Sequence, residues 1–112
     1  MWRSFDVRAV VRAIPLDDAR VVAGADGLNR PVTRGWLAAT PEHLRRVAAG
    51  DLVVTTAAAV AATAEPWEQV VARLDAAQVA ALALRLDDTA TVPASLVDAA
   101  DRLGLPVITF PA

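Results

Sequence analysis

The chain is 112 residues long, which is enough for one domain with a modest core and too few for two. Its formal net charge is −2, and all eleven basic residues are scattered Arg residues, so it lacks the positive face that nucleic acid requires. Cysteine is absent, which excludes disulfides, thiolate metal sites and a Cys nucleophile within this chain. No apolar run of about eighteen residues is free of charge, so neither a membrane span nor a secretory signal is predicted, and we expect a soluble cytoplasmic protein.

An amphipathic helix is predicted close to the start of the sequence. Its apolar residues follow the i, i+3, i+4, i+7 spacing of one helix face. They are Val7, Val10, Val11 and Ile14. Pro15 is expected to end this helix, because proline lacks an N–H and disfavours the helical conformation of the residue before it.

A small β portion follows the first helix. A short strand is predicted over Arg20–Ala23, where Val, Val and Ala follow one another. Residues 24–31 form a turn cluster in which Gly24 and Gly27 are free to take positive φ. A second strand over residues 32–38 is expected to pair nearby.

The next segment has the start signals of a short helix. Thr40 can cap it, with Pro41 at the first helical position and Glu42 near the positive end of the helix dipole. Gly50 is expected to close this segment, because glycine readily takes the left-handed conformation that ends helices.

The rest of the chain alternates short apolar runs with segments of helical period. The apolar runs are Asp51–Thr56, 81–85 and 107–110. One helical segment starts near Pro66, and a second runs over residues 93–104. Strands separated in this way run parallel, with the helices as crossovers. The predicted fold class is therefore a single α/β domain with a mainly parallel, mixed sheet flanked by helices and a small N-terminal β portion.

A candidate ligand site is predicted where the parallel strands end. Ligands of open α/β sheets bind outside the carboxyl ends of the strands, which places Thr55, Thr56 and Arg85 on one rim. Hydroxyls can bond a carbonyl or carboxylate, and a guanidinium can bind an anion through two N–H groups. The structural interpretation stands beside this one, because Thr at a strand end also serves as a cap and Arg there is also simply solvated. Trp36 stacks on a planar ligand, fills a partner's pocket or fills the core, and these three alternatives stay open.

Residues with the spacing of a catalytic or metal site are not found in the sequence. His43 is the single His and has no Cys, His or carboxylate partner at ligand spacing, so we interpret it as a surface residue. The acidic pairs at 17–18 and 87–88 are expected to be solvated turn residues. Lys is absent, which excludes a P-loop and Schiff-base chemistry. We therefore expect no enzyme activity, no metal and no cofactor.

Five separated blocks of the sequence carry a resemblance to a known family. They are Val-Val-Ala-Gly at 21–24, Gly-Leu-Asn-Arg-Pro-Val at 27–32, Gly-Asp-Leu-Val-Val-Thr-Thr at 50–56, Ala-Leu-Ala-Leu-Arg at 81–85 and Ala-Ala-Asp-Arg-Leu-Gly-Leu-Pro-Val-Ile at 99–108. Read together, they resemble the N-terminal domain of PucR-type bacterial transcription regulators, the purine catabolism regulator family. The blocks span nearly the whole chain in the family's order, which makes them more specific together than any one alone.

The resemblance implies a regulatory function. In that family this domain precedes a central region and a C-terminal helix-turn-helix domain that binds DNA. The resemblance therefore implies that residues 1–112 are a sensing or association domain excised from a longer chain. It implies a non-catalytic role, either sensing a small metabolite of the purine-breakdown type or forming a homodimer. Direct contact with DNA or with a membrane is not expected from this segment.

The resemblance also bears on the ligand site. Asn29 and Arg30 resemble the family's Asp/Asn-Arg pair, which either orders its own loop by hydrogen bonding or touches a ligand. Family members commonly carry a polar stretch with a His where this chain has residues 34–39, and Trp36 stands in the place of that His. Ala57 replaces the Gly that usually follows the Thr pair. These departures keep an alternative open: a protein-interaction or accessory module that retains the fold and has lost the ligand site.

Overall fold

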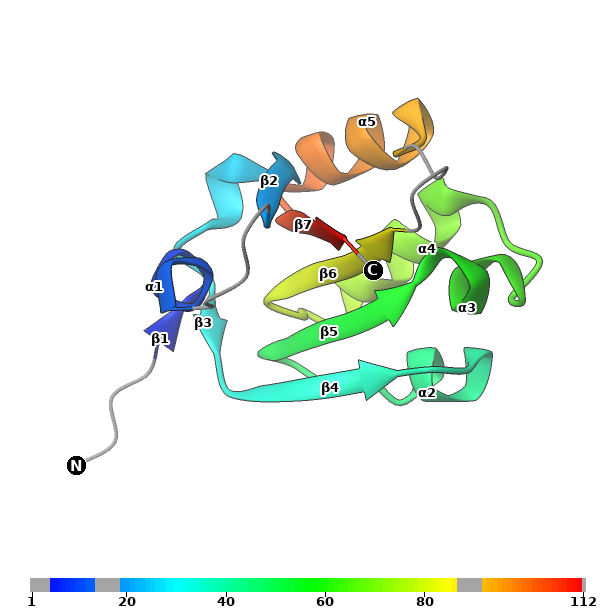
Figure 1. The fold of residues 1–112 in the computed structure, drawn as a ribbon, viewed down its shortest axis with the longest axis horizontal. Helices are drawn as coiled ribbons and strands as arrows, with labels where there is room; N and C mark the ends of the chain where they lie inside the picture. Colours follow the sequence, from blue (N-terminus) through cyan, green and yellow to red (C-terminus); the bar gives the residue numbers. More distant parts are fainter. Residues whose placement is uncertain (1–4, 14–18, 87–91, 112) are drawn as a thin grey trace.

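Strands and helices alternate along most of the chain (Figure 1). The structure is a computed structural model that describes residues 5–13, 19–86 and 92–111. The elements, in chain order, are β1 (Phe5–Asp6), α1 (Val7–Ala13), β2 (Arg20–Ala23), the 3-10 helix η1 (Ala25–Gly27), β3 (Pro31–Val32), β4 (Arg34–Ala38), α2 (Pro41–Arg45), β5 (Asp51–Thr56), α3 (Ala57–Ala61), α4 (Trp67–Ala76), β6 (Ala81–Leu86), α5 (Ala94–Leu103) and β7 (Val107–Pro111).

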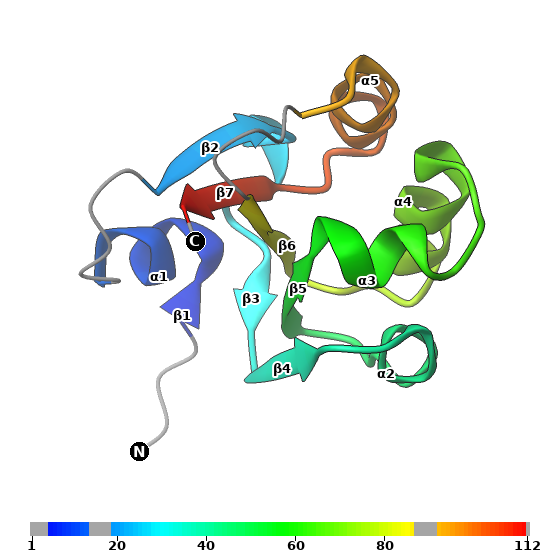
Figure 2. The same ribbon diagram turned by 45° about the vertical axis from the view of Figure 1, so that its right-hand side comes forward.

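The main sheet has five strands in the order β2-β7-β6-β5-β4. Strands β4, β5, β6 and β7 run parallel to one another, and β2 pairs antiparallel with β7 at one edge. The short strands β1 and β3 form a separate antiparallel pair, which lies with α1 beside the main sheet (Figure 2). The predicted fold class is confirmed: a single α/β domain with a mixed sheet, flanking helices and a small N-terminal β portion.

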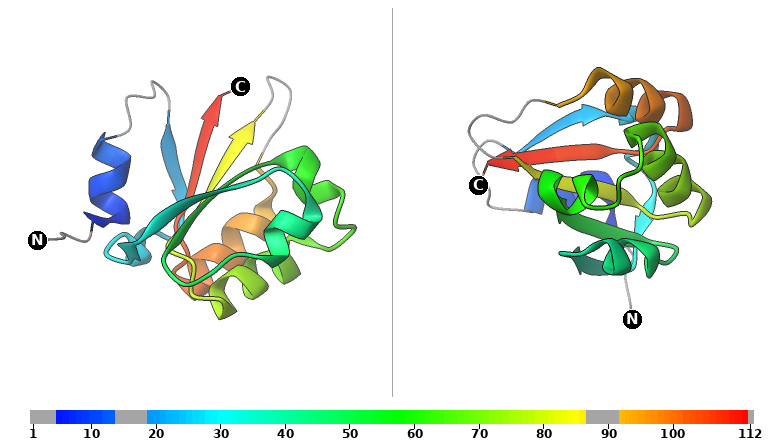
Figure 3. Two further views of the ribbon diagram at one scale, coloured as in Figure 1. Left: turned by 90° about the horizontal axis from the view of Figure 1, so that it is seen from below. Right: turned by 90° about the vertical axis from the view of Figure 1, so that its right-hand side faces the viewer.

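Two hydrophobic clusters cover the two faces of the main sheet. The larger cluster joins Val53 on β5 to Leu74 on α4 and Leu96 on α5. The smaller cluster joins Val7 on α1 to Ile108 on β7. Figure 3 accordingly shows α4 and α5 on one side of the sheet and α1 on the other. Burying apolar side chains on both faces is the main term that holds such a layered fold together.

The helix boundaries follow the signals in the sequence. Helix α4 begins directly after Pro66 and α5 directly after Pro93. Gly104 ends α5 in the left-handed conformation, with φ 65°. The Thr40 side chain caps α2 by accepting a hydrogen bond of 3.2 Å from the N–H of His43. These predictions are confirmed, because caps and breakers act through their immediate neighbours in the chain.

The strand predicted over residues 32–38 is wrong in one respect. It is interrupted at Thr33, whose N–H donates to the carbonyl of Gly50 at 2.8 Å. The first part, β3, pairs with β1, and the second part, β4, pairs with β5. The apolar pattern predicted an extended segment correctly, but it does not report that the two parts belong to different sheets.

Two further local predictions need correction. Gly50 does not close a helix, because α2 ends at Arg45 and Gly50 lies immediately before β5 with φ 81°. A Cβ on Gly50 would lie 2.4 Å from the Oγ1 of Thr33, so the position requires glycine for space as well as for conformation. The helical segment between β5 and β6 is two helices, α3 and α4, rather than one.

Some sequence predictions fall on parts of the chain outside the described residues. These are the helix end at Ile14 and Pro15 and the acidic pairs at 17–18 and 87–88. Within the described ranges, no helix is both long enough and apolar enough to span a membrane.

The position of Val53 makes the strand assignment testable. Val53 is fully buried on β5, in register with Trp36 on one side and Leu82 on the other. The variant Val53→Asp places an unpaired carboxylate in this core, which costs several kcal/mol and is expected to prevent stable folding. Phe5→Asp is the matched control, because Phe5 on β1 is 56% exposed. Circular dichroism during thermal unfolding checks both variants, and a Val53→Asp protein that melts like the wild type contradicts the assignment.

Candidate ligand site

The carboxyl ends of β5 and β6 bring two of the predicted site residues together. Thr56 and Arg85 are register partners on these neighbouring parallel strands. Arg85 is exposed at the rim, as the sequence predicts for the end of β6. Thr55 lies one residue earlier, and its side chain therefore points to the opposite face of the sheet. The rim thus presents Thr56 and Arg85 on one face, with Thr55 below them on the other.

Both threonine hydroxyls have partners inside the protein. The Thr55 hydroxyl is buried and donates to the carbonyl of Ala38 on β4 at 2.7 Å. The Thr56 hydroxyl caps α3 by accepting a hydrogen bond of 3.1 Å from the N–H of Ala59. The structure therefore gives these residues the cap and strand-bridging roles that were the alternative interpretation. A ligand role for Thr55, Thr56 and Arg85 stays a prediction.

Trp36 packs into the core side of β4. Its indole N–H donates to the carbonyl of His43 at 2.8 Å, and the two rings meet edge to face with centroids 6.2 Å apart. Trp36 also packs against the larger hydrophobic cluster and is in register with Val53, three residues before the end of β5. His43 is half-buried, and its Nδ1 accepts a hydrogen bond of 3.3 Å from the N–H of Ala39. Core filling is thus the role that these contacts describe for Trp36.

A buried carboxylate that the sequence analysis did not single out lies at the start of β5. Asp51 is fully buried and accepts hydrogen bonds from Arg34 Nε at 2.6 Å, Arg34 Nη2 at 3.1 Å and the N–H of Ala48 at 2.7 Å. The hydrogen bond with Asp51 raises the pKa of Arg34 above its ordinary value. The Arg34 guanidinium also lies over the Trp36 ring, 4.7 Å from its centroid. This bidentate pair connects β4 to β5 at their amino ends.

Arg30 connects the glycine turn to two helices. Its Nη2 donates to Asp75 Oδ1 on α4 at 2.8 Å and to the Leu103 carbonyl on α5 at 3.1 Å. Its Nη1 donates to the Val79 carbonyl at 3.0 Å. Arg30 therefore orders its loop in two ways: its side chain binds distant segments, and its backbone N–H donates to the Gly27 carbonyl at 3.0 Å. Asn29 beside it is exposed.

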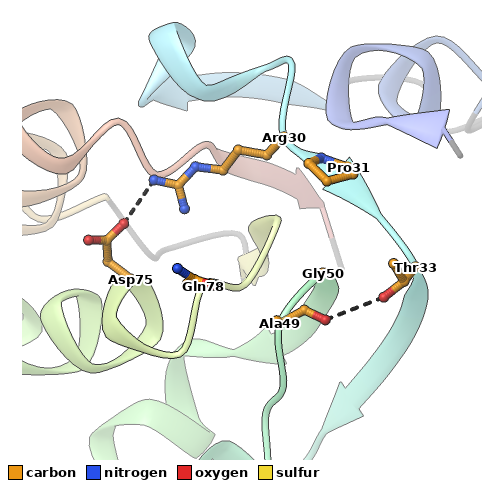
Figure 4. A pocket seen from close by; sticks show the side chains of 7 residues that line it. All are labelled: Arg30, Pro31, Thr33, Ala49, Gly50, Asp75 and Gln78. Atoms are coloured by element: carbon orange, nitrogen blue, oxygen red, sulfur yellow. Dashed lines mark hydrogen bonds and ion pairs between the residues drawn. The ribbon is translucent and has the colours of Figure 1, made fainter.

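A hollow beside these residues lies at the amino ends of the parallel strands, opposite the predicted rim, and Figure 4 draws the side chains that line it. It has a volume of about 510 Å³. Three separate segments form it: the loops around β3, the loop before β5, and the carboxyl end of α4 with the turn that follows. The lining residues are Arg30, Pro31, Thr33, Ala49, Gly50, Asp75 and Gln78.

The polar groups of this pocket are of mixed character. Figure 4 shows Arg30 paired with Asp75 on one wall and the Thr33 hydroxyl turned toward the Ala49 carbonyl on the other. Gln78 lies between them with φ 62°, and its side-chain amide has no hydrogen-bond partner among the described residues. The same holds for the Nε of Arg30 within the described part of the chain. The pocket thus offers free hydrogen-bond donors and acceptors. The charges of Arg30 and Asp75 cancel each other, so this pair gives the pocket no net charge.

A smaller cavity of about 220 Å³ lies on the carboxyl side of the sheet. It is bounded by α3, the starts of α4 and α5, and the end of β6. Its lining is mostly apolar, with Glu65 the charged member: Ala57, Val60, Ala61, Glu65, Trp67, Leu84, Leu86 and Pro93. Arg85 and the two threonines of the predicted site do not line it.

Sequence reasoning found one residue of the larger pocket, Arg30, and missed the others. Thr33, Gly50, Asp75 and Gln78 follow no common spacing, since they come from loops far apart in the chain. Gly50 carried a usable signal, because a glycine immediately before a strand suggests a close backbone approach. The positive φ of Gln78 could not be predicted from the sequence, because glutamine is not a residue that favours this conformation.

The elements and the sheet order define a small α/β domain with a five-stranded mixed sheet. Among solved structures, the fold is similar to the CBS and DRTGG domains of the regulatory region of Clostridium perfringens pyrophosphatase, which was crystallised with its activator, diadenosine tetraphosphate. The TM-score is 0.53 at 19% sequence identity, and the match covers 82% of this chain but 36% of that one. The chain belongs to the PucR family, described as purine catabolism regulatory protein-like, whose sequence model matches residues 9–112. A search of curated proteins gave no match.

The buried carboxylate at the start of β5 gives a stability test. Asp51→Ala removes the acceptor of the Ala48 N–H and both bonds of Arg34, and we expect the free energy of unfolding to fall by about 1–3 kcal/mol. Glu42→Ala is the control, because its ion pair with Arg46 is exposed and is worth roughly 0.5 kcal/mol or less. Urea unfolding measures both variants. Equal losses in the two proteins contradict the structural role of Asp51.

Proposed function

We propose that this chain is the effector-sensing domain of a PucR-like transcription regulator, acting in the cytoplasm and without catalysing a reaction. Membership of a regulator family over residues 9–112 supports the regulatory part of this proposal. The similar fold in the pyrophosphatase regulatory region, a protein complexed with a nucleotide activator, supports the idea that this fold serves ligand sensing. The family description supports a purine-breakdown metabolite as the effector.

The observation that carries the proposal is the pocket at the amino ends of the strands. Its volume of about 510 Å³ lies within the range of roughly 300–1,000 Å³ typical of small-molecule sites. The Gln78 amide, the Thr33 hydroxyl and the remaining N–H groups of Arg30 are the few convergent polar groups that orient a ligand in such sites. The pairing of Arg30 with Asp75 keeps the wall electrically neutral, which suits a small polar heterocycle better than a highly charged anion.

Two variants distinguish this pocket from the carboxyl rim. Gln78→Gly removes the free amide and keeps the positive φ, so we expect about tenfold weaker ligand binding with unchanged folding. Arg85→Ala should leave the affinity unchanged. If the rim is the site instead, Arg85→Ala weakens an anionic ligand by roughly 1.5–3 kcal/mol and Gln78→Gly has no effect.

Thermal unfolding in the presence of purine-breakdown metabolites finds the ligand, and calorimetry on the two variants locates its site. A ligand present at about 100 times its Kd stabilises the folded state by roughly 2.7 kcal/mol, which a melting curve resolves. Stabilisation by one metabolite, lost in Gln78→Gly alone, supports the proposal. The absence of any stabilising metabolite favours the interaction-module alternative.

We also propose that this segment does not contact DNA directly. The net charge of −2 and the scattered Arg residues provide no continuous positive surface for phosphate binding. We therefore expect no sequence-dependent shift of duplex DNA in a mobility assay with this chain at ordinary salt. Nanomolar binding that depends on the DNA sequence contradicts this proposal.

Association is a second candidate function, and a specific observation favours it. Strand β4 lies at an edge of the main sheet and carries Leu37, which is 71% exposed. Exposed apolar side chains on a free edge strand are typical of surfaces that pair with another chain. A homodimer formed through this edge agrees with the association role implied for the family's N-terminal domain.

A further inference from the structure

Strand β4 forms a free edge of the main sheet, visible as the outermost strand in Figure 1. One side of β4 pairs with β5 in unbroken register, from Arg34 opposite Asp51 to Ala38 opposite Thr55. No strand among the described residues pairs with its other side. Every second residue of such an edge presents an N–H and a carbonyl that another strand can bind.

The other edge of the sheet differs from β4 in the features that prevent pairing. Strand β2 is four residues long, begins at the exposed Arg20, and shifts its register between Val21 and Ala23. Short length, charge and an irregular register all blunt an edge. Strand β4 has a regular register and no proline, and its charged residue, Arg34, is bound by Asp51. The edge at β4 is therefore left open in a sheet whose opposite edge is protected.

The face of β4 that points away from α4 and α5 carries a leucine, Leu37, next to a glycine, Gly35, which has no side chain. Leu37 is 71% exposed on this face. Gly35, two residues earlier on the same face, is also exposed, and no heavy atom lies within 4 Å of the position a Cβ would take. The apolar side chain of Leu37 thus lies beside the exposed backbone of Gly35, where there is room for another side chain.

We infer that β4 pairs antiparallel with β4 of a second copy of this chain, about a two-fold axis that is perpendicular to the sheet and passes midway between the two Trp36 residues. In this register Leu37 lies opposite the partner's Gly35, so each leucine covers the space that the other copy's glycine leaves open. Arg34 lies opposite the partner's Ala38, so no like charges face each other. The contact is isologous and uses both free edges, and the assembly closes as a dimer.

This inference rests on the association role within the proposed function, and its test is separate from the test of the ligand pocket. Self-complementarity selects a second copy over an unrelated strand, because the Leu37 and Gly35 pair matches itself under the two-fold axis. A ligand that stabilises the chain without any dimer leaves the sensing proposal intact and removes this one. A dimer without any ligand does the reverse.

Sedimentation equilibrium over a wide concentration range tests the association. The weight-average mass should rise from 11.7 kDa toward twice that value as the concentration increases. Leu37→Arg places a charge against the partner's backbone and should raise the dimer dissociation constant at least about tenfold, while circular dichroism shows unchanged folding. Leu103→Arg is the matched control: Leu103 is 40% exposed on α5, away from β4, and its replacement should leave the dimer unaffected.

Disulfide trapping tests the register. The chain has no cysteine, so any added thiol is unique. Mixing the Gly35→Cys and Leu37→Cys variants under mild oxidation should give mainly the mixed disulfide, because directly opposite Cβ atoms lie about 4.5–5.5 Å apart and diagonal ones roughly 7–8 Å. A chain that stays monomeric to high micromolar concentration overturns the inference. So does a dimer that Leu37→Arg leaves intact, or trapping without preference for the mixed pair.

Discussion

The guanidinium of Arg30 connects the loop before β3 to three other segments of the domain. Its hydrogen bonds reach Asp75 on α4, the Val79 carbonyl before β6 and the Leu103 carbonyl at the end of α5. Carbonyls at a helix end lack partners within the helix, so a cation there satisfies them and interacts favourably with the helix dipole. The pocket exists because these hydrogen bonds of Arg30 fix the loop before β3 over the turn after α4. The hydrogen bonds that form one wall of the pocket are therefore the same ones that hold these segments of the fold together.

Other polar side chains at the two ends of β5 are used in a similar way. Thr55 ties β5 to β4 and Thr56 begins α3, while Asp51 binds both the loop before it and Arg34. A buried polar group costs free energy unless it is hydrogen-bonded, so these side chains bind groups of the domain itself. The groups left for a ligand are those in the loops, such as Gln78, which carry little of the fold's stability.

Periodic features of this fold could be predicted from the sequence, and features formed by loops could not. The spacing of apolar residues predicted α4, α5 and the parallel strands, because each residue's burial repeats along its own element. The break at Thr33 was missed, since β3 and β4 read as one apolar run although they join different sheets. The pocket was missed because Arg30 and Gln78 meet only after the whole sheet has assembled, and local spacing holds no record of that.

The pocket and the open edge of the sheet share one segment of the chain. Thr33 lines the pocket, its N–H binds the Gly50 carbonyl, and the next residue begins β4. A ligand that contacts Thr33 and Gln78 would fix the start of β4, and pairing of β4 with a second copy would fix the same residues from the other end. If each event orders residues that the other must also order, the coupling free energy between ligand binding and strand pairing is the same in both directions. The proposed ligand site and the proposed dimer contact are therefore compatible, because the pocket ends at Thr33 and the pairing edge begins at Arg34.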